Sequence, residues 1–322
     1  MTTPEPGPRR AAHAAAAANA HPAPPRASRT GLVVAVVFLL VVLLVALPRI
    51  LSGAASGPTG DDSAARPPLA TSLPVPQFAV TEGVCGEDAV RAALAAGDDE
   101  AVIVAAGGGE AFRAAVVSGA APCISLSDAS RRWVVVDKLR PLDPVDAEPS
   151  SLVVPASVPS LNGGNLRQDA ADALGALADG ARAAGAGEVA MLSGYRSYTT
   201  QRSTYAQHVG ADGQELADLE SARPGYSEHQ TGITVDLVAC DDGCGDLDGF
   251  AASSQGAWVA EHAWEYGFVI RYEAGATDVT GYKAEPWHLR FLGPELARAY
   301  HDGSWHSLEE FFGLPAAPDY AD

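Results

Sequence analysis

The chain has 322 residues and is 47% hydrophobic, enough for one good-sized domain with accessory segments or for two small domains. Its 21 Lys and Arg are outnumbered by 40 Asp and Glu, which gives a net charge of −19. This balance argues against nucleic acid and anionic lipid headgroups as partners, and solubility is explanation enough for it.

The N-terminal part of the chain contains one long apolar run. Residues 1–30 are rich in Ala and Pro, and we predict a disordered cytoplasmic tail there. Residues 31–51 are predicted to form a single transmembrane anchor, since they approach the ~20 residues that a spanning helix needs. Arginines dominate the flank before the run, which places the N-terminus in the cytoplasm and the rest of the chain outside. A cleaved signal peptide is the alternative.

Two segments separate the anchor from the main domain. Residues 52–77, rich in Ser, Gly, Asp and Pro, are predicted to form a flexible stalk. Residues 78–130 are predicted to form a small accessory subdomain, with helical patterns at 87–96 and 110–118.

All four cysteines of the chain follow the anchor, in two local pairs. Outside the membrane an even number predicts disulfides, which would join Cys85 to Cys123 and Cys240 to Cys244. A structural zinc site built from all four cysteines is the alternative, although these segments show no other ligand-pair spacing.

Residues 131–315 are predicted to form the main domain, and residues 316–322 a short tail. Apolar patterns predict strands at 133–136, 188–192, 233–239, 269–272 and 287–291. Helices are predicted at 165–184, capped by Asn165, and at 198–209, 256–266, 294–300 and 307–312. Because helices and strands mix without βαβ regularity, we predict an α+β fold, an antiparallel sheet flanked by helices.

One strand contains an isolated carboxylate. Asp236 follows His229 by seven residues and is the only charged residue of an apolar strand. A buried, unpaired carboxylate is costly, so a metal or a strong hydrogen-bond network would explain it. Alternation along the strand turns Asp236 away from Ile233, Val235 and Leu237, so the carboxylate can face a cleft. Arg271, in another strand, is interpreted as the structural partner of a buried carboxylate.

A second histidine, His288, has a carboxylate close by in the sequence. Glu285 precedes it by three residues, and both could not share one face of a regular strand. Pro286 favours an irregular strand start that would let both reach one site. Two imidazoles, one carboxylate and an open fourth position are the usual ligands of catalytic zinc, and Glu285 could then act as general base. The alternative is purely structural, with His229 capping a turn and Asp236 in a salt bridge.

Three motifs carry a family resemblance: Ser-Gly-Tyr-Arg-Ser at 193–197, Ser-Glu-His-Gln-Thr-Gly-Ile-Thr-Val-Asp-Leu at 227–237 and Glu-Pro-Trp-His-Leu-Arg at 285–290. In this order and spacing they resemble the VanY-type D-alanyl-D-alanine carboxypeptidases. That family belongs to the zinc metallopeptidase superfamily that also contains lysostaphin-like enzymes and the hedgehog domain. The resemblance runs from about residue 133 to residue 313. It implies one Zn²⁺ held by His229, Asp236 and His288, with Glu285 as catalytic base.

The resemblance also implies a substrate site. Arg196 would bind the substrate carboxylate or carbonyl, and Gln201 and Ser227 would contact the terminal D-residue. Tyr195 and Trp287, which belong to the same motifs, are interpreted as pocket wall or core.

The implied reaction is removal of the terminal D-Ala from peptidoglycan stem peptides, outside a bacterial cell membrane. Zinc-bound water would attack the carbonyl, with Glu285 as general base and acid. L,D-carboxypeptidase, D,D-dipeptidase and endopeptidase activities on the same scaffold remain open. A non-catalytic wall-binding module is the alternative from a different class, and such a module usually lacks a ligand or the base.

Overall fold

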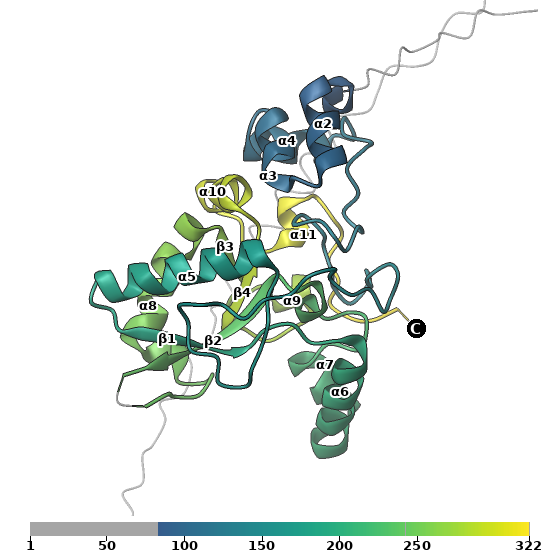
Figure 1. The fold of residues 1–322 in the computed structure, drawn as a ribbon. Coiled ribbons are helices and arrows are strands. Elements are labelled where there is room, and N and C mark those ends of the chain that lie inside the picture. Colours follow the sequence, from purple (N-terminus) through teal and green to yellow (C-terminus); the bar gives the residue numbers. More distant parts are fainter. Residues whose placement is uncertain (1–82, 242, 322) are drawn as a thin grey trace, which may run out of the picture. The chain divides into compact units, whose positions relative to one another are not determined.

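The computed structural model describes residues 83–241 and 243–321, which belong to one compact unit, Pro76–Asp322 (Figure 1). The predicted tail, anchor and stalk, residues 1–77, lie outside the described residues. Among the helices of the described residues, none is long and apolar enough to cross a membrane.

Four strands form one antiparallel sheet in the order β1-β2-β4-β3 (Figure 1). The strands are β1 (Glu188–Ser193), β2 (Thr234–Cys240), β3 (Phe268–Tyr272) and β4 (Glu285–Phe291). β2 and β4 are therefore the central strands, and the predicted α+β class with an antiparallel sheet is confirmed.

One face of the sheet is apolar and packs against two helices, α5 (Gln168–Ala183) and α8 (Ser254–His262). Ile233, just before β2, and Val235 and Leu237 of β2 share a fully buried cluster with Leu174 of α5 and Val259 of α8. Burial of each such side chain contributes roughly 1.5–3 kcal/mol, so this face is the main hydrophobic core. Alternation along β2 leaves Asp236 on the opposite face, as predicted.

The opposite face is covered by the C-terminal helices α10 (Pro294–Asp302) and α11 (Leu308–Phe311) and by the segment before α5. The predicted accessory segment, 78–130, contains α2 (Asp88–Ala96), α3 (Asp99–Ala105) and α4 (Gly109–Val117). Ile103 and Phe112 from this segment lie in one buried cluster with Trp133, Leu296 and Phe311. Helices α2–α4 therefore share a hydrophobic core with the C-terminal helices.

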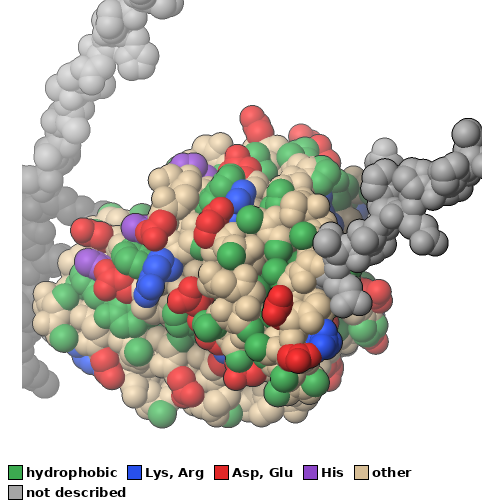
Figure 2. Space-filling model, turned by 90° about the horizontal axis from the view of Figure 1, so that it is seen from above, with side chains coloured by type: hydrophobic (Ala, Val, Ile, Leu, Met, Phe, Trp, Pro, Cys, Tyr) green, Lys and Arg blue, Asp and Glu red, His purple; other side chains and the backbone are tan. Residues whose placement is uncertain are grey.

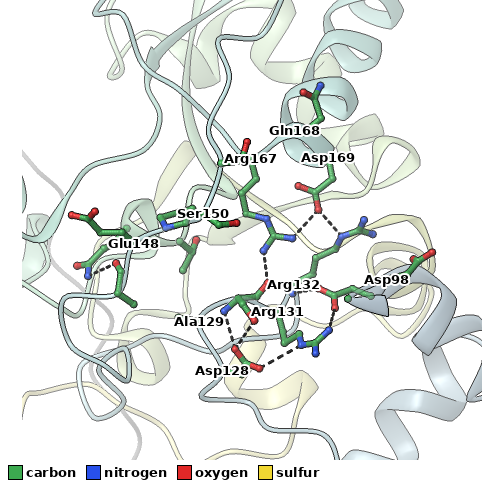
Figure 3. Close-up of a pocket in the computed structure, with 18 of the residues that line it drawn as sticks. Asp98, Asp128, Ala129, Arg131, Arg132, Glu148, Ser150, Arg167, Gln168 and Asp169 are labelled. Carbon is green, nitrogen blue, oxygen red and sulfur yellow. Dashed lines mark hydrogen bonds and ion pairs between the residues drawn. The ribbon is translucent and has the colours of Figure 1, made fainter. Parts of the chain in front are cut away.

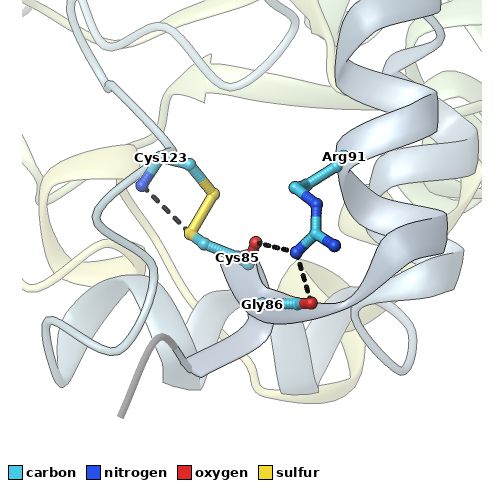
Figure 4. Close-up of a disulfide and its surroundings, with 4 residues drawn as sticks. All are labelled: Cys85, Gly86, Arg91 and Cys123. Carbon is cyan, nitrogen blue, oxygen red and sulfur yellow. Dashed lines mark hydrogen bonds between the residues drawn. A yellow bond between two sulfur atoms is a disulfide. The ribbon is translucent and has the colours of Figure 1, made fainter. Parts of the chain in front are cut away.

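Both predicted disulfides are present. Cys85–Cys123 closes the α2–α4 segment, and Cys240–Cys244 closes a short loop after β2. Figure 4 shows the first disulfide beside Arg91, whose guanidinium donates hydrogen bonds to the carbonyl oxygens of Cys85 and Gly86.

The strand predicted at 133–136 is wrong. This segment is buried, but it joins no strand of the sheet. Arginine side chains satisfy its backbone instead: Arg290 donates to the carbonyl of Val134 at 2.6 Å, and Arg271 to that of Val136 at 3.5 Å. Because these carbonyls already have donors, the segment needs no neighbouring strand for them.

The predicted helix cap at Asn165 is also wrong. Helix α5 begins at Gln168, with Arg167 at the cap position. The carbonyl of Asn165 instead accepts a hydrogen bond from the Tyr195 amide at 2.7 Å, which holds the loop after β1.

The remaining elements are α6 (Tyr198–Asp212), α7 (Gln214–Glu220), α9 (Thr277–Thr280) and the 3-10 turns η1 (Gly83–Gly86), η2 (Glu228–Thr231), η3 (Phe250–Ala252) and η4 (Ala263–Tyr266).

The surface reflects the acidic composition. On the face seen in Figure 2, Asp and Glu side chains are scattered among apolar and neutral ones, and Lys and Arg form no large patch. That distribution agrees with the argument against a polyanionic partner.

Candidate metal centre and catalytic site

The two central strands bring Asp236 and His288 together. They are directly paired between β2 and β4, on the face opposite the main apolar core. His229 comes from η2, the turn before β2, and all three side chains are buried. Asp236 Oδ2 lies 3.1 Å from His229 Nε2, and Asp236 Oδ1 lies 3.2 Å from His288 Nδ1. We call these three residues the ligand cluster.

The ligand cluster fits a zinc ion. Its donor atoms all lie within 4.8 Å of one another. In a tetrahedral zinc site with ordinary metal–ligand distances, two ligand atoms lie about 3.3 Å from each other. The distances from the two Asp236 oxygens to His229 Nε2 and to His288 Nδ1 are close to this value. Asp236 Oδ1 is buried and has no hydrogen-bond partner among the described residues, a lack that a metal ion would remedy. The three residues predicted as ligands therefore do come together.

Hydrogen bonding and burial prepare His229 to bind a metal. Its Nδ1 lies 2.7 Å from the carbonyl oxygen of Gly194, so the ring donates its proton there and leaves Nε2 free. Burial lowers the pKa of His229 despite the neighbouring Asp236 carboxylate, which favours the neutral ring that a metal requires. Burial alone would raise the pKa of Asp236, but the two imidazoles hold it below its ordinary value.

Glu285 reaches the same site through an irregularity in β4. The ladder pairs Ile270 with Leu289 but Tyr272 with Glu285, so the register shifts between these pairs. The shift lets Glu285 and His288 meet although they are three residues apart, and Glu285 Oε2 lies 3.3 Å from His288 Nδ1. The side chain of Glu285 is 15% exposed, which leaves its carboxylate accessible to water and substrate.

Arg196 lies beside the ligand cluster, in the loop after β1. It donates to Gln201 Oε1 at 2.8 Å and to Ser193 Oγ at 2.9 Å, and it lies 3.9 Å from Asp236 Oδ2. Two side chains therefore fix a partly exposed guanidinium next to the metal site. A guanidinium in such a place can bind a carboxylate or an oxyanion.

The other predicted contacts are placed less favourably for a substrate. Gln201 is fully buried, and its Nε2 donates to the carbonyl of Ala222 at 2.6 Å. Both ends of its amide are thus bound within the chain, so in this geometry Gln201 holds Arg196 and presents no free group to a peptide. Ser227 is buried just before η2. Tyr195 and Trp287 are partly buried, and Trp287 packs against the main core.

Glu228, which no sequence pattern singled out, lies beside His288. This carboxylate is buried and accepts hydrogen bonds from Arg271 Nε at 3.0 Å and Arg290 Nη1 at 2.6 Å. Arg271 also binds Glu309 of α11 through two hydrogen bonds, at 3.0 and 2.7 Å. We call Glu228, Arg271, Arg290 and Glu309 the buried charge cluster. The predicted pairing of Arg271 with a buried carboxylate is confirmed, but nothing in the sequence pattern identified which one.

A large open cavity lies elsewhere, between the start of α3, the start of α5 and the segments 128–132 and 143–151 (Figure 3). Its volume is about 960 Å³, and none of the ligand cluster lines it. Figure 3 shows its arginines turned to carboxylates: Arg131 to Asp128, and Arg132 and Arg167 to Asp169. Asp99 and Glu100 pair with Arg131 and Arg132 as well, so all three cations have counter-charges within the chain. We therefore interpret the lining of the cavity as a structural ion-pair network and assign the chemistry to the ligand cluster.

Comparisons with known proteins agree with this site. Residues 163–294, which include the ligand cluster, Glu285 and Arg196, match the family model of VanY, D-alanyl-D-alanine carboxypeptidase. The chain is 38% identical over 173 residues to the putative carboxypeptidase YodJ of Bacillus subtilis (strain 168), covering 52% of this chain and 63% of that protein. It is 35% identical over 147 residues to a D-alanyl-D-alanine carboxypeptidase of Enterococcus faecalis (strain ATCC 700802 / V583), covering 42% of this chain and 51% of that protein.

A solved structure shows the same similarity in three dimensions. The LdcB LD-carboxypeptidase, whose structure is described as revealing the molecular basis of peptidoglycan recognition, is 37% identical to this chain with a TM-score of 0.53. The similarity covers 57% of this chain and 86% of that one. The chain spans less than two thirds of the length of the two curated relatives named above, and the matched family model does not include helices α2–α4.

Proposed function

Because the chain belongs to the VanY-type D-alanyl-D-alanine carboxypeptidase family, we propose that it is a zinc-dependent enzyme that removes the terminal D-alanine from peptidoglycan stem peptides. The observation that carries the proposal is the ligand cluster. It combines two buried imidazoles with a carboxylate, one oxygen of which has no hydrogen-bond partner among the described residues, and Glu285 lies against it. One zinc ion would complete this set of ligands.

Glu285 is proposed to move the proton in this reaction. A bound zinc would polarise the scissile carbonyl and lower the pKa of a water molecule. The Glu285 carboxylate takes one proton from the attacking water as the new C–O bond forms. It then returns that proton to the amine nitrogen as the peptide C–N bond breaks, so that peptide and free D-alanine leave. Asp236 cannot share this role, because a carboxylate bound to the metal is neutralised by it and is a poor proton acceptor.

Arg196 is proposed to bind the negative charge of the substrate. Its guanidinium is held by Ser193 and Gln201 at the edge of the ligand cluster. Binding the terminal carboxylate of a peptide would favour cleavage of the last bond, whereas binding the carbonyl oxygen would stabilise the tetrahedral oxyanion.

An L,D-carboxypeptidase is the second candidate. The similarity to the LdcB LD-carboxypeptidase, which covers 86% of that chain, favours it. In this reaction the same zinc ligands and Glu285 would remove the D-alanine that follows an L-configured centre.

Mass spectrometry of purified muropeptides, incubated with the zinc-loaded protein, separates these reactions. Conversion of pentapeptides to tetrapeptides identifies a D,D-carboxypeptidase, and conversion of tetrapeptides to tripeptides an L,D-carboxypeptidase. Release of free D-Ala-D-Ala would identify a dipeptidase, and loss of cross-linked dimers an endopeptidase. A protein that binds no zinc and cleaves none of these substrates would contradict the proposal and favour a non-catalytic wall-binding module.

We also propose that residues 31–51 anchor the chain in a bacterial cell membrane, with the catalytic unit outside. The apolar run, the arginines before it and the two disulfides support this location, since disulfides persist in oxidising compartments. Alkaline extraction of membranes should retain the full chain. A mature protein that begins after residue 51 and is released by the extraction would show a cleaved signal peptide instead.

A further inference from the structure

The two carboxylate oxygens of Glu228 have different partners. Oε1 accepts hydrogen bonds from both Arg271, at 3.0 Å, and Arg290, at 2.6 Å. Oε2 accepts none from any described residue, and it lies 3.5 Å from His288 Nε2. A carboxylate that served only to pair with the arginines could offer them both oxygens. Here one oxygen is kept for the imidazole.

His288 also has a ring nitrogen without a hydrogen-bond partner among the described residues. Its Nδ1 faces the ligand cluster, 3.2 Å from Asp236 Oδ1, while its Nε2 is buried without a hydrogen-bond partner in the described part of the chain. The Glu228 carboxylate is the acceptor in front of this nitrogen. A small movement of the ring would shorten the contact to an ordinary hydrogen bond.

The buried charge cluster fixes the position of Glu228. Two arginines and two glutamates balance in charge, so the cluster needs no additional proton from His288. Arg290 is tied to the carbonyls of Arg132 and Val134 at 2.8 and 2.6 Å, and Arg271 is tied to Glu309. Glu228 is therefore held from β3, β4, α11 and the 131–137 segment.

From this geometry we propose that Glu228 is a positioning residue of the metal centre. Its Oε2 accepts the Nε2 proton of His288, which keeps the lone pair of Nδ1 directed at the metal. Residues that fix a ligating imidazole in this way typically improve metal affinity 10- to 100-fold. The inference rests on the proposed zinc site, and it assigns to Glu228 a role separate from its pairing with the arginines.

A matched pair of variants tests this role. In E228Q the two arginines take the single amide oxygen, so an NH2 group that cannot accept a hydrogen bond faces His288. E309Q makes the same change at an equally buried glutamate that binds Arg271 and not His288. Zinc affinity is measured for the full chain by competition with a chromophoric chelator. We expect E228Q to bind zinc 10- to 100-fold more weakly and E309Q to bind it as the wild type does. Wild-type affinity in E228Q, or an equal loss in E309Q, would overturn the proposal.

A second measurement needs no substitution, in case E228Q fails to fold. Long-range ¹H–¹⁵N correlation of the zinc-loaded wild type, labelled at histidine, shows which ring nitrogen carries the proton. We expect the proton on Nε2 in His288 and on Nδ1 in His229, where the carbonyl of Gly194 accepts it. An unprotonated Nε2 in His288 would overturn the role of Glu228. A wild-type chain that binds no zinc would contradict the proposed function instead, so the two failures are distinguishable.

Discussion

Two buried polar clusters lie on the same face of the sheet, and they differ in how well their atoms are satisfied. In the buried charge cluster, both arginines donate to carboxylates and to main-chain carbonyls. In the ligand cluster, Asp236 Oδ1 is buried with no hydrogen-bond partner in the described structure. The arginines of the first cluster are therefore satisfied within the chain, and its one carboxylate oxygen without a hydrogen bond, Glu228 Oε2, faces His288 of the second cluster, where the described residues leave Asp236 Oδ1 unpaired. Such an imperfection in an otherwise well-packed core marks a functional site.

The clusters also differ in what would complete them. Glu228 and Glu309 balance the charges of Arg271 and Arg290, so the buried charge cluster needs no ion from outside the chain. The ligand cluster brings together nitrogen and oxygen atoms whose lone pairs can bind a positive charge. A cation can fill that role, and the contact between His288 and Glu228 joins the two clusters.

The largest effect is expected at Glu285, where a substitution should nearly abolish catalysis and leave metal binding intact. E285Q should lower kcat/KM about 10²- to 10⁴-fold, because an amide cannot accept the proton of the attacking water. Its zinc content should stay at the wild-type level, since Glu285 is not a ligand. Muropeptide kinetics and metal analysis measure both, with E261Q, at an exposed site, as the control. Full activity in zinc-loaded E285Q would assign the base to another group.

The second prediction breaks the buried charge cluster. R290M removes a fully buried cation that binds Glu228 and the carbonyls of Arg132 and Val134. Loss of one partner from a buried pair costs about 3–5 kcal/mol of unfolding free energy. Denaturant unfolding in the presence of a chelator measures it.

Its control is R182M, at an ion pair that is largely exposed on α5, where we expect a change of at most about 1 kcal/mol. If R290M proved no more destabilising than R182M, the description of a satisfied, stabilising cluster would be incorrect.

Local sequence patterns predicted part of the geometry of the ligand cluster, and the family resemblance supplied the full set of three residues. The alternation around Asp236 follows from the strand period, and the position of Pro286 indicated the irregularity that brings Glu285 to His288. These features depend on residues a few positions apart. A pattern within one strand can therefore reveal them.

The buried charge cluster depends on contacts between distant segments, and the sequence did not reveal it. Arg290 satisfies the carbonyl of Val134, 156 residues away, which is why the apolar run at 133–136 joins no strand of the sheet. Glu228 adjoins His229 in the chain, yet its partners Arg271 and Arg290 come from β3 and β4. The burial of Gln201 in a polar helix likewise depends on Arg196 and on the Ala222 carbonyl. The spacing of apolar and polar residues along one helix or strand does not reveal such contacts between distant segments.

Metal addition should sharpen the difference between the two clusters. Zinc at about 100 times its dissociation constant should stabilise the wild type by about 2.7 kcal/mol, because it binds the folded chain. In D236N this stabilisation should disappear, since one ligand is lost. Thermal unfolding with zinc and with chelator measures the effect, and E285Q, which keeps all three ligands, is the control. Undiminished stabilisation in D236N would place the zinc elsewhere.

The smallest expected effect concerns Arg196, at the edge of the ligand cluster. S193A removes one of the two side-chain acceptors that hold its guanidinium and leaves Gln201 in place. A lost hydrogen bond of about 0.5–1.5 kcal/mol corresponds to a rise in KM of roughly 2- to 10-fold, with kcat nearly unchanged, if Arg196 binds the substrate carboxylate. S203A, on the exposed side of α6, is the control and should match the wild type. A fall in kcat at constant KM would instead mean that Arg196 acts on the oxyanion of the transition state, because only that charge develops during the reaction.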